Sequence, residues 1–509
     1  MKATNPSSCE QMDVYPSSSV SRLPPELLAN IFQQPFPIDF STPPIPLLQR
    51  SIDQPLEVDI SASPISPTSE KLIAAKEVLS LHNHRIRKLA VDLPARCLLE
   101  IRRELHAAFP ILADVTIGVV LDGSYSAGFS EWTPSPVPSV VRCLRLLLVA
   151  TPWVPGRFCN LVELFLHDQS YIGFDPSTEI LLGILESSPQ LAILSVANAG
   201  PRLPLHTTTL PPATRVVHLH NLRQLYIEQT DACDVGWMLI HLDIPASANV
   251  RIFVDLSLSN VPIGLVFELA LPDHQELPHL TDLHCCTYTV DSPSSCLITA
   301  PNFAFRFIWG NWVHRHRCED FMLPFLRRVT AMGIMEELSI ILKVVSDDRI
   351  CQWPWNEILG TLGSLRRLKV KQLQDDVDFP IRDLLRSYLC PTLRDLQLSR
   401  IVFGGEQEGE RLGGPVMGKL VDYCAERDRR GNRLERLVIE APSNAPPDLA
   451  SFLVPYVDHV ETREDVSRDG DVGDIEFGSR RVFDSLRARR RDKSRPNTPN
   501  FLQRNVQGS

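Results

Sequence analysis

The densest group of potential metal ligands in the sequence is His314 and His316, followed closely by Cys318 and Glu319. Two histidines one residue apart place both imidazoles on the same face of a strand, an arrangement that zinc can use. Arginines lie between and directly after the two histidines and would repel a bound cation. We therefore predict a solvated loop or surface patch at this segment, and we expect no metal and no cofactor in the protein.

The sequence contains none of the common motifs for catalysis. It has no GxxxxGK[ST] or GxGxxG phosphate loop, no GxSxG nucleophile turn and no HExxH zinc helix. Serine, histidine and aspartate are frequent, but no spacing groups them as nucleophile, base and orienting acid. We therefore predict that the protein is not an enzyme.

The composition is that of an ordinary globular protein: 509 residues, 44% hydrophobic and 22% charged. The first residues lack the apolar core of a secretion signal, and no window of about 18 apolar residues is present to span a membrane. The 12 cysteines are scattered and form no CxxC pair, which favours a reducing compartment. These features predict a protein of the cytoplasm, the nucleus or both, with no membrane partner.

The charge is distributed unevenly along the chain. The net charge is −10, but residues 480–509 hold nine Lys/Arg and two Asp, a local +7, so the remainder carries −17 (−10 minus 7). An acidic body argues against a nucleic-acid partner. The basic stretch Arg487–Pro496 is either a nuclear-import signal or acidic-surface contact, or a disordered tail with no role.

A short phrase of the form apolar-x-x-apolar-x-apolar returns twelve times along the chain, and most copies start 20 to 31 residues after the previous one. The copies begin at Ile86, Leu112, Val141, Leu161, Leu191, Leu222, Phe253, Leu280, Met335, Leu365, Leu393 and Leu434. A longer gap before Met335 leaves room for one degenerate copy within residues 303–309. Recurrence at this period is typical of a repeat array.

Each phrase ends in a strand-like alternation, as in Glu163 to His167, where Leu164 and Leu166 point one way and the residues between them the other. Amphipathic helical segments follow at 177–188, 320–333, 380–389 and 417–431. A strand followed by a helix, repeated, predicts parallel strands joined by crossovers, in a sheet that curves into a horseshoe. The alternative is an ordinary α/β domain with a doubly wound sheet, which does not require one phrase to return twelve times.

The phrase resembles the leucine-rich repeat, LxxLxLxx(N/C)xL, over roughly residues 85–460. The position that often holds asparagine is Gln169, Ala199 and Thr230 in three successive copies, which predicts that the side-chain amide ladder of that family is missing. The resemblance implies a right-handed α/β solenoid of about 12–14 irregular repeats. We expect this solenoid at 71–462, after a disordered N-terminus at 1–20, a short helix at 21–34 and a Pro/Ser-rich linker at 35–70. A disordered tail at 463–509 would follow it.

The short helix is the segment SRLPPELLANIF, Ser21 to Phe32, whose apolar residues recur at helical spacing and whose prolines stand in the first turn. It resembles the opening of the F-box, LPxELLxxIF. In that family this helix inserts apolar side chains into a groove of a Skp-type adaptor, which links to a cullin–RING ubiquitin ligase. The resemblance implies that the adaptor-binding residues are Leu23, Pro24, Leu27, Leu28, Ile31 and Phe32.

Two further segments look like phrases found after the F-box in basidiomycete fungal proteins: LLQRSIDQPLEV from Leu47 and LSLHNHRIRKLAVDLP from Leu79. The second half of the F-box departs from the family, because the prolines between Pro35 and Pro46 forbid its usual second helix. The F-box is therefore truncated. Either its first helix still recruits the adaptor, or it is a lone helix held against the N-terminal cap of the solenoid.

The order of an F-box-like helix before leucine-rich-like repeats predicts a non-enzymatic substrate-recognition subunit of a Skp–cullin–F-box ubiquitin ligase. The alternative is a repeat scaffold with an eroded F-box and no link to a ligase. In either case, a protein client would bind the concave face of the strands. The candidate client-binding residues on that face are Glu163, Phe165, Gln224, Tyr226, Arg367, Lys369 and Lys371.

Overall fold

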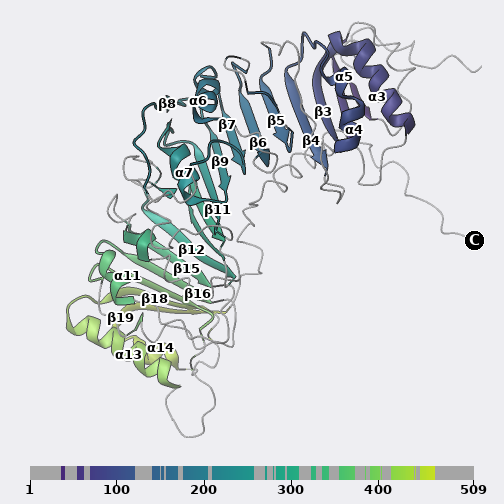
Figure 1. Cartoon of the computed structure of the whole chain (residues 1–509). Helices are drawn as coiled ribbons and strands as arrows, with labels where there is room; N and C mark the ends of the chain where they lie inside the picture. The colour runs from purple at the N-terminus through teal and green to yellow at the C-terminus, as the bar shows by residue number, and fades with distance from the viewer. Residues whose placement is uncertain are drawn as a thin grey trace, which may run out of the picture.

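The computed structural model of the chain is a mixed α/β structure built on one large, open and mostly parallel sheet (Figure 1). It describes residues 36–39, 54–61, 69–120, 140–149, 151–153, 156, 158–169, 176–203, 209–256, 270–271, 279, 283–292, 295–308, 323–327, 335–342, 355–372, 384–385, 390–401, 403, 414–440, 442 and 448–464. The predicted F-box-like helix, the His314–His316 segment and the basic tail lie outside these residues.

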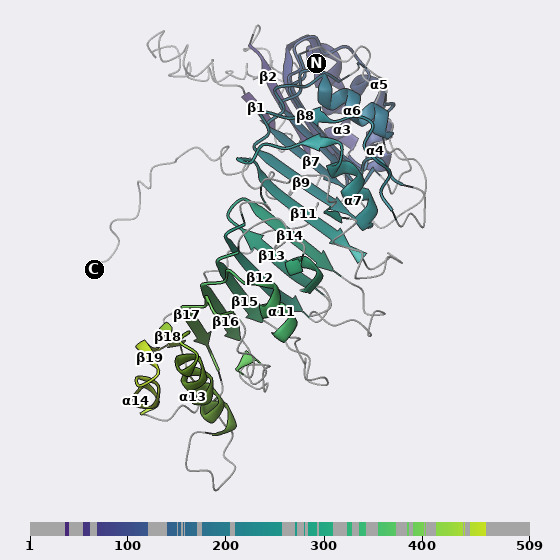
Figure 2. The same ribbon diagram turned by 90° about the vertical axis from the view of Figure 1, so that its left-hand side faces the viewer.

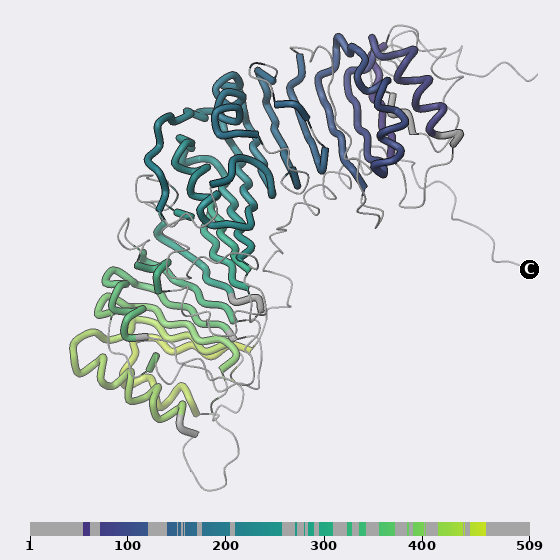
Figure 3. The backbone as a smooth tube through the Cα atoms, viewed as in Figure 1, coloured from purple at the N-terminus to yellow at the C-terminus, as the bar shows by residue number. Residues whose placement is uncertain are grey.

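Neighbouring strands follow the order of the chain along the N-terminal part of the sheet, and every pair there is parallel. These strands are β1 (Phe36–Asp39), β2 (Leu56–Ser61), β3 (Ile86–Pro94), β4 (Asp114–Val120), β5 (Cys143–Leu147), β6 (Glu163–His167), β7 (Ile193–Ala197), β9 (Gln224–Gln229) and β11 (Asn249–Asp255). The strands stand side by side and the sheet bends into an arch, which the backbone trace in Figure 3 follows.

The middle of the sheet contains an antiparallel insertion whose strands are met in reverse order. Next to β11 lies β14 (Phe303–Ile308), followed by β13 (Ser295–Ala300) and then β12 (Cys285–Ser292) (Figure 2). Only β13 among the described strands runs against its neighbours. Parallel pairing then resumes through β15 (Glu337–Leu342), β16 (Arg367–Gln372), β17 (Asp395–Ser399), β18 (Leu434–Glu440) and β19 (Val457–Arg463).

One face of the sheet carries the main apolar core. Residues at alternate positions of each strand, such as Leu164 and Leu166 of β6, are fully buried there and align across neighbouring strands. The buried apolar side chains of the described helices belong to the same cluster. The helices are α3 (Ser69–His82), α4 (Ala95–Glu100), α5 (Arg102–Leu105), α6 (Thr178–Glu186), α7 (Ala232–Leu239), α11 (Trp355–Thr361), α13 (Gly414–Arg429) and α14 (Leu449–Leu453).

This one-sided packing has a simple cause. Each helix buries one apolar stripe, and the strand phrases supply one aligned apolar row for it to cover. The opposite sheet face, which we call the open face, holds the other set of alternate residues, such as Glu163, Phe165 and His167. Among the described helices, none is both long and apolar enough to cross a membrane.

Most of the repeated phrases fall on strands in a common register, which confirms the prediction of parallel, regularly spaced strands. Two phrases are misplaced. The copy at Phe253 lies six residues late, because Val250, and not Leu256, pairs with Leu225 of the copy at Leu222. The copy at Leu280 lies early, because Cys285 pairs with Glu337 at the start of β15. The degenerate copy expected at 303–309 is β14.

The segment 35–70 was expected to be a linker, but it contributes β1 and β2 to the sheet. In β2, Leu56, Val58 and Ile60 alternate with polar residues and are buried in the main core beside β3. A strand of this length is marked by only three apolar side chains on one face, which is a weak signal in a sequence. The many prolines and serines around it therefore favoured the prediction of a linker.

Several strands end in a residue with left-handed backbone geometry. Leu148, Asp168, Asn198 and Arg400 have φ between 44° and 57° and directly follow β5, β6, β7 and β17. Each donates its N–H to the next strand, as Asp168 does to the Ala197 carbonyl at 2.7 Å. The turn is therefore tied to the sheet, which offsets the cost of left-handed geometry.

Two side-chain amides next to the expected positions connect the same turns, although Ala199 and Thr230 at those positions carry no amide. Asn198 donates from Nδ2 to Asp168 Oδ1 at 3.0 Å, and Gln229 donates from Nε2 to the Ala199 carbonyl at 2.5 Å. The amides stand one residue before the expected position or at the end of the strand. A search at a single fixed position therefore misses them.

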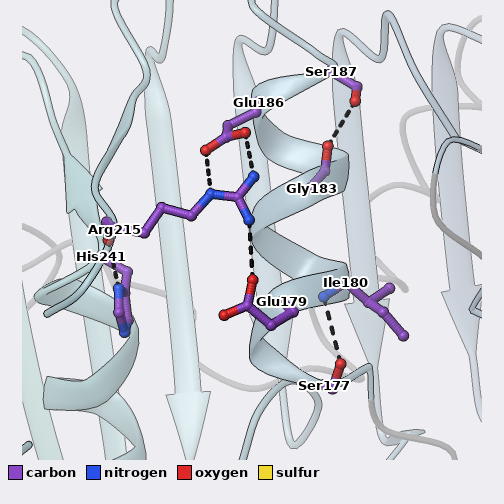
Figure 4. A network of polar contacts seen from close by, with 8 residues as sticks. All are labelled: Ser177, Glu179, Ile180, Gly183, Glu186, Ser187, Arg215 and His241. Atoms are coloured by element: carbon purple, nitrogen blue, oxygen red, sulfur yellow. Dashed lines mark hydrogen bonds and ion pairs between the residues drawn. The ribbon is translucent and has the colours of Figure 1, made fainter.

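On the helix side, Arg215 fastens the approach to the short strand β8 (Val217–His218) onto α6 (Figure 4). Its guanidinium pairs with both oxygens of Glu186 and reaches Glu179 at 3.2 Å. The hydrogen bonds to Arg215 lower the pKa of Glu186. Both carboxylates are exposed and Arg215 is half-buried, so the contacts define the position of this segment more than they stabilise the fold.

The start of α6 gives a direct test of local structure. Ser177 is the N-cap, and its Oγ accepts a hydrogen bond from the Ile180 N–H at 3.4 Å (Figure 4). We expect Ser177→Ala to lower the free energy of unfolding by about 1 kcal/mol, because one helix N–H loses its partner. Urea denaturation measures the loss. Ser177→Asp restores an acceptor and should retain most of the stability, so an equal loss in both variants would contradict the capping role.

Candidate interaction surface

On the C-terminal part of the open face, charged side chains alternate in sign from strand to strand. Arg367 on β16 donates from Nη1 to Glu337 of β15 at 2.6 Å and from Nε to Asp395 of β17 at 3.2 Å. These three residues share one row of the sheet, so the strand register places the Arg367 guanidinium between two carboxylates. The hydrogen bond to Asp395 and the charge of Glu337 raise the pKa of Arg367.

The alternation continues on β18 and β19. Arg436 donates to Glu461 at 2.9 Å, and Arg463 donates to the same carboxylate at 2.5 Å. These hydrogen bonds, first from Arg463 and then from Arg436, lower the pKa of Glu461 to about 2. Because β19 pairs only with β18 among the described strands, its charged side chains also disfavour pairing with another chain at this edge.

Two polar residues of β17 converge on one carboxylate of β18. Gln397 donates from Nε2 to Glu440 at 2.5 Å, and Ser399 donates from Oγ to its other oxygen at 2.7 Å. Lys369 and Lys371 occupy the same rows as Gln397 and Ser399 on the neighbouring strand β16, and both are half-buried. This part of the open face therefore presents a mixed lattice of both charges, suited to polar contacts with a protein surface.

The N-terminal part of the open face holds a similar arrangement around Arg145, but buried. Arg145 on β5 donates to Asp114 of β4 at 2.8 Å and also to Glu163 of β6, while its guanidinium lies 5.2 Å from the centre of the Phe165 ring. Burial alone would lower the pKa of Arg145, but Asp114 and Glu163 outweigh it and raise that pKa. The guanidinium is therefore fixed as a cation in this site.

The centre of the open face is apolar and closely packed. Ala197, Tyr226, Phe253, Leu297 and Ala304 form a second buried cluster, separate from the core under the helices. Its members come from β7, β9, β11, β13 and β14, the last two belonging to the antiparallel insertion. The insertion therefore completes an apolar patch that parallel neighbours alone do not make.

Buried polar pairs border this patch. His167 shares a hydrogen bond of 2.8 Å between Nε2 and Ser195 Oγ, and the Tyr226 hydroxyl donates to Glu228. His167 and Ser195 have the residue types of a nucleophilic pair. Both are almost completely buried, so they hold adjacent strands together and offer no access to a substrate.

Of the seven predicted client-binding residues, five remain accessible on the open face. Gln224 and Arg367 are exposed, and Glu163, Lys369 and Lys371 are half-buried. Phe165 and Tyr226 are buried, with only 5% and 8% of their surface exposed, so these two candidates are not accessible to a client in this structure. Both rings pack beside His167, at 6.2 Å and 6.5 Å between ring centres.

The six predicted adaptor-binding residues fall outside the described residues, and so do His314 and His316. Within the described part of the chain, no group of three or more histidine, cysteine, aspartate or glutamate side chains is arranged to hold a metal. Sequence analysis missed the role of Arg145. The sequence does contain a clue to this site. Aligning three successive phrases as neighbouring strands places Asp114, Arg145 and Glu163 on adjacent strands.

No protein-family model matches the chain, and no curated protein matches it.

Proposed function

We propose that the chain is a non-enzymatic substrate-recognition subunit of a Skp–cullin–F-box ubiquitin ligase. The observation that carries the proposal is the order of two features: the F-box-like segment 21–34, and after it the long sheet of repeated strands. The first would recruit the adaptor and the second would bind a protein client for ubiquitin transfer.

We further infer that the sheet and its helices form a leucine-rich-repeat-like solenoid of about 12–14 irregular repeats. Parallel strands in register, one for each repeated phrase, support this inference, as does a helical layer on one face. The antiparallel strand β13 interrupts the pattern, and it accounts for the irregular spacing before Met335.

The open face supports a role in protein recognition. Its accessible residues combine both charge signs with an amide, as at Arg367, Asp395 and Gln397. Such mixed polar surfaces give specificity toward a protein partner through complementary charge. Gln224 and Glu163 extend the accessible polar surface toward the N-terminal strands.

Co-purification with a Skp-type adaptor tests the proposal. The full chain is expected to bind the adaptor, and Leu27→Asp combined with Ile31→Asp is expected to weaken binding about 100-fold or more. Two apolar anchors of a helix-in-groove contact are then replaced by charges. The measurement is the dissociation constant, or retention on immobilised adaptor.

Arg367→Glu provides the matched control, because it introduces a carboxylate on the open face and should leave adaptor binding unchanged. Failure of the wild-type chain to bind, or equal binding by the double variant, would remove the ligase proposal. The remaining reading is then a repeat scaffold with an eroded F-box, recognising its partner through the open face alone.

A further inference from the structure

Strand β16 carries three cationic side chains at alternate positions of the open face. They are Arg367, Lys369 and Lys371, which we call the cation column. Alternate residues of a strand are about 6.6 Å apart, so the three residues form an evenly spaced line. In its own row of the sheet, Lys369 lies between Ser339 of β15 and Gln397 of β17, and neither of these neighbours carries a charge.

The carboxylates on the nearby strands are already bonded to other side chains. Each carboxylate on the open face of β15, β17, β18 and β19 accepts a hydrogen bond, and these residues are Glu337, Asp395, Glu440 and Glu461. Arg367 of the cation column bonds the first two. Lys369 is half-buried, and within the described part of the chain no hydrogen bond or ion pair engages its ammonium group.

A half-buried ammonium group in this position favours a partner that carries a carboxylate. It has lost part of its hydration, and no opposite charge from the chain replaces what is lost. A carboxylate from a partner would supply that charge, whereas a lysine or arginine would be repelled. Phosphate is bound best by the paired N–H groups of an arginine, but Arg367 already directs its guanidinium at Glu337 and Asp395.

The N-terminal part of the open face has the opposite balance of charge. On β2 to β6 its acidic residues outnumber its basic residues. The acidic residues are Glu57, Asp59, Asp92, Asp114 and Glu163, and the basic residues are Lys88 and Arg145. These strands would repel an acidic partner that β16 attracts, so the charge pattern directs such a partner to the C-terminal part of the face.

We propose that the cation column binds an extended acidic segment of the client protein, with carboxylates at alternate residues facing Lys369 and Lys371. An extended chain repeats the side chains of one side about every 6.6 Å, which is the spacing of the cation column. The identity of this partner as a client rests on the proposed function, whereas its acidic character follows from the charges of the surface itself.

Fluorescence anisotropy with the full chain tests the proposal. The probe is a labelled ten-residue peptide of alternating serine and glutamate, and the reference peptide has glutamine in place of glutamate. We expect the glutamate peptide to bind at least about tenfold more tightly than the glutamine peptide. Lys369→Gln is expected to weaken binding of the glutamate peptide about fivefold, and Lys369→Arg should retain most of the affinity.

Lys88→Gln is the matched control. Lys88 is half-buried on the same open face, and its substitution changes the net charge by the same amount, but its ammonium group already lies 3.6 Å from Glu57. We expect this variant to bind the glutamate peptide as the wild type does. Equal losses in Lys369→Gln and Lys88→Gln, or equal binding of the two peptides by the wild type, would overturn the proposal.

Two other probes test the chemistry of the partner. A peptide with phosphoserine in place of glutamate, or a single-stranded oligothymidylate, is expected to bind no more than about tenfold more tightly than the glutamate peptide. Tighter binding of either would overturn the assignment of a carboxylate partner.

Adaptor binding separates this proposal from the proposed function. A chain that binds the adaptor but not the glutamate peptide would keep the ligase function and overturn the acidic client. A chain that binds the peptide through Lys369 but binds no adaptor would support the cation column as a binding surface and remove the ligase function.

Discussion

Arg145→Met is expected to lower the free energy of unfolding by about 3 kcal/mol. The guanidinium is 9% exposed, and it pairs with Asp114 and Glu163 from the two flanking strands. Removing it leaves two partly buried carboxylates side by side with no cation between them. Their partial contact with water keeps the cost below that of a fully buried broken pair. Urea denaturation, read as the change in midpoint at constant slope, measures the loss.

Arg367→Met is the matched control, because Arg367 also lies between a glutamate and an aspartate on the flanking strands. Its side chain is 51% exposed, so the expected loss is below about 1 kcal/mol. Similar losses in the two variants would show that burial does not distinguish these sites. A small effect at Arg145 would mean that Asp114 and Glu163 are solvated well enough without it.

The second large effect is expected at Phe305 in β14. Phe305 is fully buried, pairs in register with Ile252 of β11 and Ile298 of β13, and lies 5.6 Å from Phe307 between ring centres. Phe305→Ala is expected to lower the free energy of unfolding by about 3–5 kcal/mol, because it removes a large apolar side chain and leaves a cavity. The same denaturation experiment measures it.

Val454→Ala serves as the control for Phe305→Ala, because Val454 is 56% exposed beyond α14 and should change stability by less than about 0.5 kcal/mol. A loss at Phe305 no larger than at Val454 would contradict the placement of β14 in the core. The antiparallel insertion would then be a surface addition and not part of the sheet that joins β11 to β15.

Much of the sheet could be predicted from the sequence, because local pattern decides it. The phrases at Leu161 and Leu365 specify alternate apolar residues, and these become the aligned buried rows of β6 and β16. The helix expected at 177–188 is α6, since Ser177 caps it and its apolar residues recur at helical spacing. Period and capping act over neighbouring residues, so they can be read without knowing the fold.

The candidate surface was only partly predictable, for a related reason. Alternation correctly placed Glu163, Phe165, Gln224 and Tyr226 on the face opposite the main core. It did not predict that Phe165 lies under Arg145, or that Tyr226 packs with Phe253 and Leu297. The face toward which a side chain points follows from the pleat of its own strand. The exposure of that side chain depends on neighbours from strands far away in the sequence.

By itself, the sequence determined that the chain builds repeated parallel strands with helices on one side, because each repeat carries its own apolar row and several carry an amphipathic helix. Tertiary structure alone decided three further features: the inclusion of β1 and β2, the reversed order of β12, β13 and β14, and the burial of Arg145 between two carboxylates. Each of these features depends on which strands become neighbours in the sheet. That choice is made by the pairing of whole strands and the apolar area buried between them, and no single repeat encodes it.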